Sequence, residues 1–175
     1  LLDRVVTDCI GRVDSVLVDN VRAAQEATFC LIENGHTEIG IIAGPRDVST
    51  AMDRLSGYIA MLKKHKIEVK DSLIEYTDFS IEGGYRACKQ LLNKNPGMTA
   101  LFTTNYDVSV GAMMAINERG ISVPDDISVF GFDDMPFAQV IKPHLSVIAQ
   151  PICEIGRSVA QMLLDRMTGN SKCHP

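Results

Sequence analysis

Four side chains have the types and spacing needed to hold a small hydroxylated molecule. They are Arg54, Phe79, Asn105 and Asp133. A planar guanidinium and a carboxylate can grip vicinal hydroxyls or ring nitrogens, and an amide can both donate and accept hydrogen bonds. A phenyl ring offers a flat apolar wall to a sugar or a base. These residue types predict a binding site, provided that the fold brings them together.

The elements that must position these residues alternate between strand and helix patterns. Short apolar runs typical of buried strands occupy residues 15–18, 38–43, 72–77, 99–104, 127–132 and 145–149. Apolar residues at helical spacing follow most of these runs. Strands separated by helices of this length predict right-handed crossovers and a parallel sheet that is covered on both faces. The expected fold class is α/β, with a doubly wound parallel sheet.

The helix boundaries are predicted from capping and stop residues. Ser49 and Ser80 are expected to cap the helices that follow them, and Pro151 is expected to open the last helix. Asn34-Gly35, Gly120 and Gly169 are expected to end helices. The last helix is predicted to turn four apolar residues inward: Ile155, Val159, Met162 and Leu163.

In a doubly wound sheet, ligands bind outside the carboxyl ends of the strands. Phe79 follows the run 72–77, Asn105 follows 99–104, and Asp133 follows 127–132. Arg54 lies early on the helix after 38–43. We therefore expect all four residues to converge on one edge of the sheet.

Each candidate also has a purely structural interpretation. Arg54 could be a solvated helix residue paired with Asp53 or Glu82. Phe79 could fill the core, and Asn105 could be a simple turn residue, which is common for asparagine at a strand end. The convergence of the four residues, more than any one of them, favours a site.

Two pairs of adjacent aspartates lie at opposite ends of one predicted strand. In Asp133-Asp134, one side chain is expected to cap the following turn. The pair Asp125-Asp126 precedes its strand and therefore lies at the wrong edge for a ligand, so we assign it to turn chemistry.

Composition limits the class of protein. The 175 residues are 46% hydrophobic and 22% charged, as in an ordinary folded chain of about one domain. A net charge of −5, with no basic cluster longer than Lys63-Lys64, argues against this segment gripping nucleic-acid phosphates itself. Five scattered cysteines without a Cys-x-x-Cys motif favour a reducing, cytoplasmic compartment. No apolar run approaches the length of a membrane helix, so no membrane contact is expected.

Motifs of catalysis are absent from the sequence. It contains no Gly-x-Gly-x-x-Gly, Gly-x-x-x-x-Gly-Lys, Gly-x-Ser-x-Gly or His-Glu-x-x-His pattern. None of the four histidines has an evident nucleophile or metal partner; they are His36, His65, His144 and His174. We expect no enzyme, no cofactor and no metal site.

Several separate motifs resemble the lactose/galactose-repressor (LacI/GalR) family of bacterial transcription regulators. In chain order they are Val16-x-Val18-Asp19-Asn20, the stretch from Leu31 to Pro45 (LIENGHTEIGIIAGP), Arg54-Leu55-Ser56-Gly57-Tyr58, the stretch from Ala100 to Asn105 (ALFTTN), Gly111-Ala112-Met113, the stretch from Val123 to Asp134 (VPDDISVFGFDD), and Pro143-x-Leu145-Ser146-x-Ile148-x-Gln150-Pro151. They keep the family's order and approximate spacing over nearly the whole chain.

The resemblance implies an effector-sensing domain of the periplasmic-binding-protein (type I) fold, with two α/β lobes and a small molecule in the cleft between them. Residues 1–18 are expected to end the amino-terminal lobe, 19–148 to form the carboxyl-terminal lobe, and 149–175 to cross back. The first residues resemble neither a signal peptide nor a natural start. The resemblance implies that most of the amino-terminal lobe, on the order of a hundred residues, lies upstream. The family's homodimers bind operator DNA through a helix-turn-helix headpiece, which these residues do not contain.

The resemblance also implies roles for individual residues. Arg54 matches the effector-gripping arginine, Asn105 a polar contact, Asp133 a carboxylate for hydroxyls or nitrogens, Phe79 a stacking ring, and Thr50 a further polar contact. Two positions depart from the purine-sensing pattern, Val48 in place of a second arginine and Ile152 in place of an aromatic residue. The departures favour a sugar or nucleoside as effector.

Two alternatives stay open. One is a periplasmic sugar-binding protein that serves a transporter on the same fold, which the cysteines and the motif wording disfavour. The other is a small α/β enzyme that uses Asp133 and Asp134 with a metal ion, although it would lack a nucleophile, a phosphate loop and a base.

Overall fold

The protein is described by a computed structural model over residues 13–136, 138 and 141–169. The chain divides into two units. The larger unit is Asn20–Ala149, and the smaller one combines Leu1–Asp19 with Gln150–Pro175.

A five-stranded parallel sheet is the centre of the larger unit. Its strand order is β2-β1-β3-β4-β5, with these bounds: β1 Ile39–Ala43, β2 Ile74–Tyr76, β3 Ala100–Thr103, β4 Ser128–Phe132 and β5 Ser146–Ile148. In the register of the two central strands, Ile41 of β1 lies opposite Phe102 of β3. The α/β fold with a doubly wound parallel sheet is confirmed.

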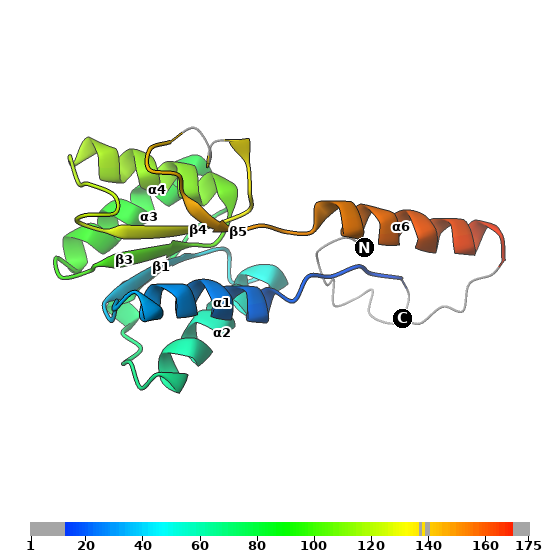
Figure 1. The fold of residues 1–175 in the computed structure, drawn as a ribbon, viewed down its shortest axis with the longest axis horizontal. Helices are drawn as coiled ribbons and strands as arrows, with labels where there is room; N and C mark the ends of the chain where they lie inside the picture. The colour runs from blue at the N-terminus through cyan, green and yellow to red at the C-terminus, as the bar shows by residue number, and fades with distance from the viewer. Residues whose placement is uncertain (1–12, 137, 139–140, 170–175) are drawn as a thin grey trace. The chain divides into compact units, whose positions relative to one another are not determined.

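Helices cover both faces of this sheet (Figure 1). Helices α1 (Asn20–Glu33) and α2 (Ser49–Lys64) lie on one face, and α3 (Ile81–Lys94) and α4 (Tyr106–Glu118) lie on the other. The alternation of strand side chains separates two cores, because Phe102 packs with α1 and α2 whereas its neighbour Leu101 packs with α3 and α4. Each helix therefore has a fixed face of the sheet to rest on.

Glycines let the helices within each layer approach closely. A Cβ atom on Gly57 of α2 would overlap the carbonyl oxygen of Val21 on α1. On the other face, a Cβ atom on Gly111 of α4 would overlap the carbonyl oxygen of Ile81 and lie 2.6 Å from the backbone nitrogen of Tyr85, both on α3. These contacts fix the amino ends of α1 and α3, which lead directly from the carboxyl edge of the sheet.

The capping predictions are confirmed in most cases. The hydroxyl of Ser80 accepts a hydrogen bond from the Gly83 nitrogen at 2.9 Å. Gly35, Gly120 and Gly169 follow their helices with positive φ angles of 88°, 67° and 73°. The prediction for Ser49 is wrong: Val48 is the N-cap, and it makes no side-chain capping bond, so Ser49 is already the first helical residue.

Three further expectations differ from the structure. The run 15–18 shows only an isolated bridge at Val16. The run 72–77 starts as a 3₁₀ turn, Asp71–Leu73, before β2 begins. Leu163, predicted to face inward, is 59% exposed, whereas Ile155, Val159 and Met162 are half-buried.

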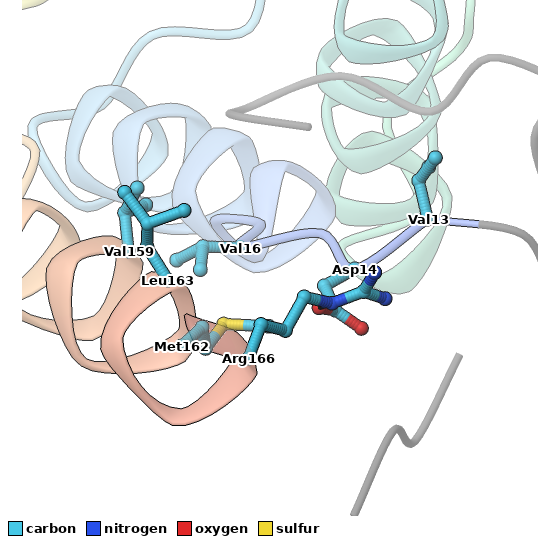
Figure 2. Close-up of a pocket in the computed structure, with 7 residues that line it drawn as sticks. All are labelled: Val13, Asp14, Val16, Val159, Met162, Leu163 and Arg166. Carbon is cyan, nitrogen blue, oxygen red and sulfur yellow. Dashed lines mark hydrogen bonds and ion pairs between the residues drawn. The ribbon is translucent and has the colours of Figure 1, made fainter. Parts of the chain in front are cut away.

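The smaller unit contains helix α6 (Ile152–Met167), none of whose residues is buried among the described part of the chain. A cavity of about 260 Å³ lies beside it, lined by Val13, Asp14, Val16, Val159, Met162, Leu163 and Arg166 (Figure 2). Arg166 Nε lies 2.5 Å from Asp14 Oδ2, so the two segments of this unit are joined by an ion pair. Across the described residues, no helix is long and apolar enough to span a bilayer.

His36 ties three strands together at the amino edge of the sheet. Its Nδ1 lies 2.9 Å from Thr99 Oγ1, and its Nε2 lies 3.0 Å from Ser128 Oγ. Thr99 leads into β3 and Ser128 begins β4, while His36 itself precedes β1. These hydrogen bonds join the starts of the strands at the edge away from the predicted site.

We predict that this contact makes stability depend on pH. Burial lowers the pKa of His36 below its usual 6.5, so the unfolded chain binds a proton more readily than the folded one. Its contribution to stability is present above about pH 6.5 and is lost as the pH falls below that value. Urea unfolding of wild type and His36→Gln at pH 7.5 and pH 5.5 measures this. Wild type should lose more stability on acidification than the variant; an equal loss would contradict the prediction.

Candidate functional site

Arg54 is buried at the carboxyl edge of the sheet, and its guanidinium is held from several sides. The side chain is 4% exposed. Its Nε donates to Asn20 Oδ1 at 2.8 Å, its Nη1 donates to the Thr104 carbonyl oxygen at 2.5 Å, and its Cζ lies 3.6 Å from the centre of the Phe132 ring. The interpretation of Arg54 as a solvated helix residue is wrong. A buried cation is costly to desolvate, and buried charged groups of this kind gather at functional sites.

The position of Arg54 coincides with the topological switch point of the sheet. Strand order reverses between β1 and β3, since the chain moves from β1 outward to β2 and then returns to β3. Arg54 follows β1 on α2, and its acceptor Thr104 follows β3. In open α/β sheets the crevice outside this pair of strands is where ligands bind.

Phe79 lies directly over the end of β1. A Cβ atom on Gly44 would overlap Cζ and Cε1 of the Phe79 ring, so the ring rests on the glycine backbone. Phe79 is half-buried and also packs against the core beneath α3 and α4. The core-filler interpretation is therefore correct in part, and the ring still reaches the edge where a ligand would stack.

A second aromatic contact fixes the loop between β1 and α2. The guanidinium carbon of Arg46 lies 3.7 Å from the centre of the Tyr76 ring, at the end of β2. The Val48 nitrogen donates to the Pro45 carbonyl oxygen at 3.2 Å, which closes a turn in the same loop. Together these contacts fix the loop that leads into α2. Thr50 lies in the first turn of that helix and is 7% exposed.

Asn105 caps helix α4. Its Oδ1 accepts a hydrogen bond from the Val108 nitrogen at 2.9 Å, so the structural interpretation of this residue holds for its oxygen. The amide nitrogen is the group that Asn105, which is half-buried, can offer to a ligand as a donor. The cap fixes the orientation of the side chain at the end of β3.

Asp133 follows β4 in an unusual backbone conformation. Its φ of +75° lies in the left-handed region, which aspartate tolerates better than most residues. Its backbone nitrogen donates to the Ile148 carbonyl oxygen at 2.9 Å, at the end of the neighbouring strand β5. Strained residues of this kind concentrate at functional sites. The expected cap by Asp133 or Asp134 stays a prediction, because the following turn includes residues outside the described ranges.

A further carboxylate, Asp78, lies beside Phe79 in the loop after β2. Hydrogen bonds from Ser80 and Thr77 lower its pKa, so it is firmly ionised at neutral pH. At the opposite edge, Asp126 Oδ2 accepts from the Ser122 nitrogen at 2.8 Å, which confirms the predicted turn role for Asp126.

Sequence reasoning missed three residues of the site. Asn20, Thr104 and Phe132 surround the guanidinium, yet they lie far from Arg54 in the chain. Asn20 did carry a signal, because a buried arginine needs acceptors and a side-chain amide supplies one. Thr104 carried none, since its acceptor is the backbone carbonyl oxygen that a residue of any type would supply. Nothing in the sequence marks Phe132 apart from other core aromatics.

Other reactive groups do not form a catalytic constellation in the described part of the chain. It contains no cluster of three metal-ligating His, Cys, Asp or Glu side chains. Burial raises the pKa of the Cys88 thiol to about 12, so this cysteine is inert. Both ring nitrogens of His36 lie within hydrogen-bond distance of hydroxyls that tie strands together. The geometry at the carboxyl edge suits binding of a polar ligand.

We predict strong coupling between Gly44 and Phe79. Gly44→Ala should lower the free energy of unfolding by about 1–3 kcal/mol, because the new methyl group displaces the ring. In the double variant Gly44→Ala/Phe79→Ala the clash with the ring is gone and only the 2.9 Å contact with the Ala51 Cβ atom remains, so the combined loss should be smaller than the sum of the single losses by about 1 kcal/mol or more. Urea unfolding of the four proteins measures this, and additive losses would contradict the packing. Gly97→Ala is the control, since nothing lies within 4 Å of its added methyl group.

Comparisons with known proteins agree with this geometry. Residues 30–175 match the family model of the periplasmic binding protein-like domain. The HTH-type transcriptional repressor CytR of Escherichia coli K12 is 39% identical over 155 residues, which cover 89% of this chain and 46% of that protein. The HTH-type transcriptional regulator CelR of Thermobifida fusca is 34% identical over 160 residues, covering 91% and 47%. The chain spans about half the length of the curated relatives it matches.

Solved structures give the same result. A complex of the transcriptional regulator CelR with cellobiose aligns with a TM-score of 0.87 and 34% identity, covering 92% of this chain and 49% of that one. A LacI family transcriptional regulator from Enterococcus faecium with bound ribose aligns with a TM-score of 0.84 and 32% identity, covering 93% and 60%. The buried arginine at the switch point, the parallel sheet and these matches lead to one conclusion: the chain belongs to the periplasmic binding protein-like domain family, and it is similar to LacI family transcriptional regulators.

Proposed function

We propose that this chain is the effector-sensing part of a DNA-binding transcriptional regulator, and that its effector is a sugar or a nucleoside. The observation that carries the proposal is the burial of Arg54 at the switch point between β1 and β3. The sugars named in the matched structures, cellobiose and ribose, support a hydroxylated effector. The departures at Val48 and Ile152 from the purine-sensing pattern support the same class.

Each site residue has a proposed role in holding the effector. Arg54 donates to hydroxyl or ring acceptors, and Asp133 accepts from hydroxyls. Asn105 donates through its amide nitrogen, since its oxygen caps α4. Phe79 stacks on the apolar face of the effector, and Thr50 adds a hydroxyl beside Arg54.

Operator DNA is proposed to be bound by a helix-turn-helix headpiece outside these 175 residues. The relatives' description as HTH-type regulators supports this, as does the net charge of −5, which is unsuited to a phosphate backbone. Effector and operator binding are then coupled by about 1–3 kcal/mol, and the coupling is reciprocal between the two ligands. The protein works in the cytoplasm and carries out no reaction.

The smaller unit is proposed to belong to the amino-terminal lobe of the sensor. Helix α6 supports this, because large apolar side chains on it are exposed, including Ile152 at 68% and Met167 at 75%. A helix of this composition is ordinarily covered by further chain. The larger unit, with its complete sheet, corresponds to the carboxyl-terminal lobe.

We predict that the full-length regulator binds at least one member of a panel of neutral sugars and nucleosides, with cellobiose and ribose included. Isothermal titration calorimetry measures the affinity. Arg54→Ala should weaken it about 10- to 100-fold, because a charged donor is lost from a desolvated site. Asp133→Asn should weaken it about 10-fold, since asparagine also tolerates the positive φ but lacks the charge.

Asp125→Asn is the matched control for charge removal at the opposite edge and should leave affinity unchanged. If both site variants bind the wild-type ligand with normal affinity, the site assignment is wrong. If no compound of the panel binds wild type, the proposed effector class is wrong.

The protein is also proposed to be a homodimer, for which α3 and α4 provide an apolar surface. Ile81 is 41% exposed and Met114 is 52% exposed. They belong to neighbouring helices, since Gly111, one turn before Met114, packs on the backbone of Ile81. Covering these side chains with a second copy would remove apolar area from water.

We predict that Met114→Glu shifts the full-length protein from dimer to monomer, because the interface would then have to bury a charge. Sedimentation velocity at low micromolar concentration measures the change. Phe29→Glu is the control: this residue is 41% exposed on α1, at the other face of the sheet, and its substitution should leave the dimer intact. A monomeric wild type, or a dimeric Met114→Glu variant, would contradict the proposed surface.

A further inference from the structure

Asn20 is the residue that joins the buried arginine to the start of the larger unit. It is 4% exposed and is the first residue of α1. Its Oδ1 accepts the 2.8 Å hydrogen bond from Arg54 Nε, and the side chains come from positions 34 residues apart. The amide is therefore fixed at the place where the chain enters the sheet-containing unit.

The chain passes between its two units at two places, after Asp19 and after Ala149. Asn20 is the first residue past the first of them. At the second, the Ile148 carbonyl oxygen accepts from the Asp133 backbone nitrogen at 2.9 Å, one residue before Ala149. Both charged residues of the proposed effector site are thus hydrogen-bonded to a residue within two positions of a passage between the units.

Close helix packing makes the first of these links stiff. Gly57 lies one turn after Arg54 on α2, and its backbone is pressed against the Val21 carbonyl oxygen on α1. Asn20 and Arg54 are therefore held by the same crossing of α1 and α2. A shift of the guanidinium by a fraction of an ångström cannot be absorbed by loose packing and has to move the start of α1.

We propose that Asn20 is a positioning residue for the effector: it orients Arg54 and transmits the state of Arg54 to the segment through which the chain enters this unit. The inference rests on the proposed function, because it assumes that Arg54 holds an effector. The role needs an acceptor at this position. Aspartate can supply one, and leucine, of nearly the same shape, cannot.

The test uses the full-length regulator with whichever panel compound stabilises wild type most in thermal unfolding. Asn20→Leu should weaken its affinity by about 10-fold or more, since a hydrogen bond to a charged group is lost. Asn20→Asp should bind within about threefold of wild type, because its carboxylate still accepts from Arg54. Thr28→Val is the matched control: this buried α1 residue loses only its 2.8 Å bond to the Ala24 carbonyl oxygen, within the same helix. It should bind normally.

Hydrogen exchange supplies a measurement that a merely structural role would not change. In wild type, saturating effector should slow deuterium uptake at residues 20–23. In Asn20→Leu at equal saturation this slowing should be absent, and in Asn20→Asp it should be present. If Asn20→Leu folds too poorly for titration, Asn20→Ala is measured in its place.

Two results separate this inference from the function on which it rests. Normal affinity and normal slowing of exchange in Asn20→Leu, or equal damage in Asn20→Leu and Asn20→Asp, would overturn the role of Asn20 and leave the effector site intact. Failure of every panel compound to bind wild type would overturn the proposed effector class and the inference with it.

Discussion

The burial of one guanidinium governs the carboxyl edge of this protein. A cation at 4% exposure loses most of its hydration, and the loss must be offset by hydrogen bonds and by the ring face beneath it. The compensation includes the Asn20 amide on α1, the Thr104 carbonyl at the end of β3, and the Phe132 ring at the end of β4. Each partner belongs to a different element. The guanidinium therefore makes these contacts only when α1, β3 and β4 are correctly placed relative to α2.

The packing of the helices thus determines the geometry of the site in this fold. The amide of Asn20 reaches Arg54 because Gly57 allows α1 to lie directly on α2. On the other face, Gly111 allows α4 to lie on the start of α3. Phe79 precedes α3 and Asn105 precedes α4, so this packing fixes the distance between the two residues. Substitutions at these glycines would act on binding without touching a ligand, through the position of the first turn of a helix.

The elements were largely predictable, and the contacts between them were not. Helices α1 to α4 follow from apolar residues at helical spacing, and Ser80 and Gly120 mark their ends by local chemistry. Ser49 has the right residue type for a cap, but the loop enters the helix one residue earlier, because the turn closed by Pro45 and Val48 sets the entry. A capping preference of about 1 kcal/mol is easily outweighed by such a turn.

The two edges of the sheet differ in what their polar side chains do, and this difference makes the edge of the site predictable from sequence. At the amino edge, both ring nitrogens of His36 lie within hydrogen-bond distance of the hydroxyls of Thr99 and Ser128, so His36 joins the starts of the strands. At the carboxyl edge, strand order reverses between β1 and β3, and ligands bind in the crevice outside the ends of such a pair of strands. Position along the strand therefore decides the edge for Arg54, Phe79, Asn105 and Asp133. The acceptors on Asn20 and Thr104 are brought to the guanidinium from 34 and 50 positions away, and no local spacing in the sequence encodes these contacts.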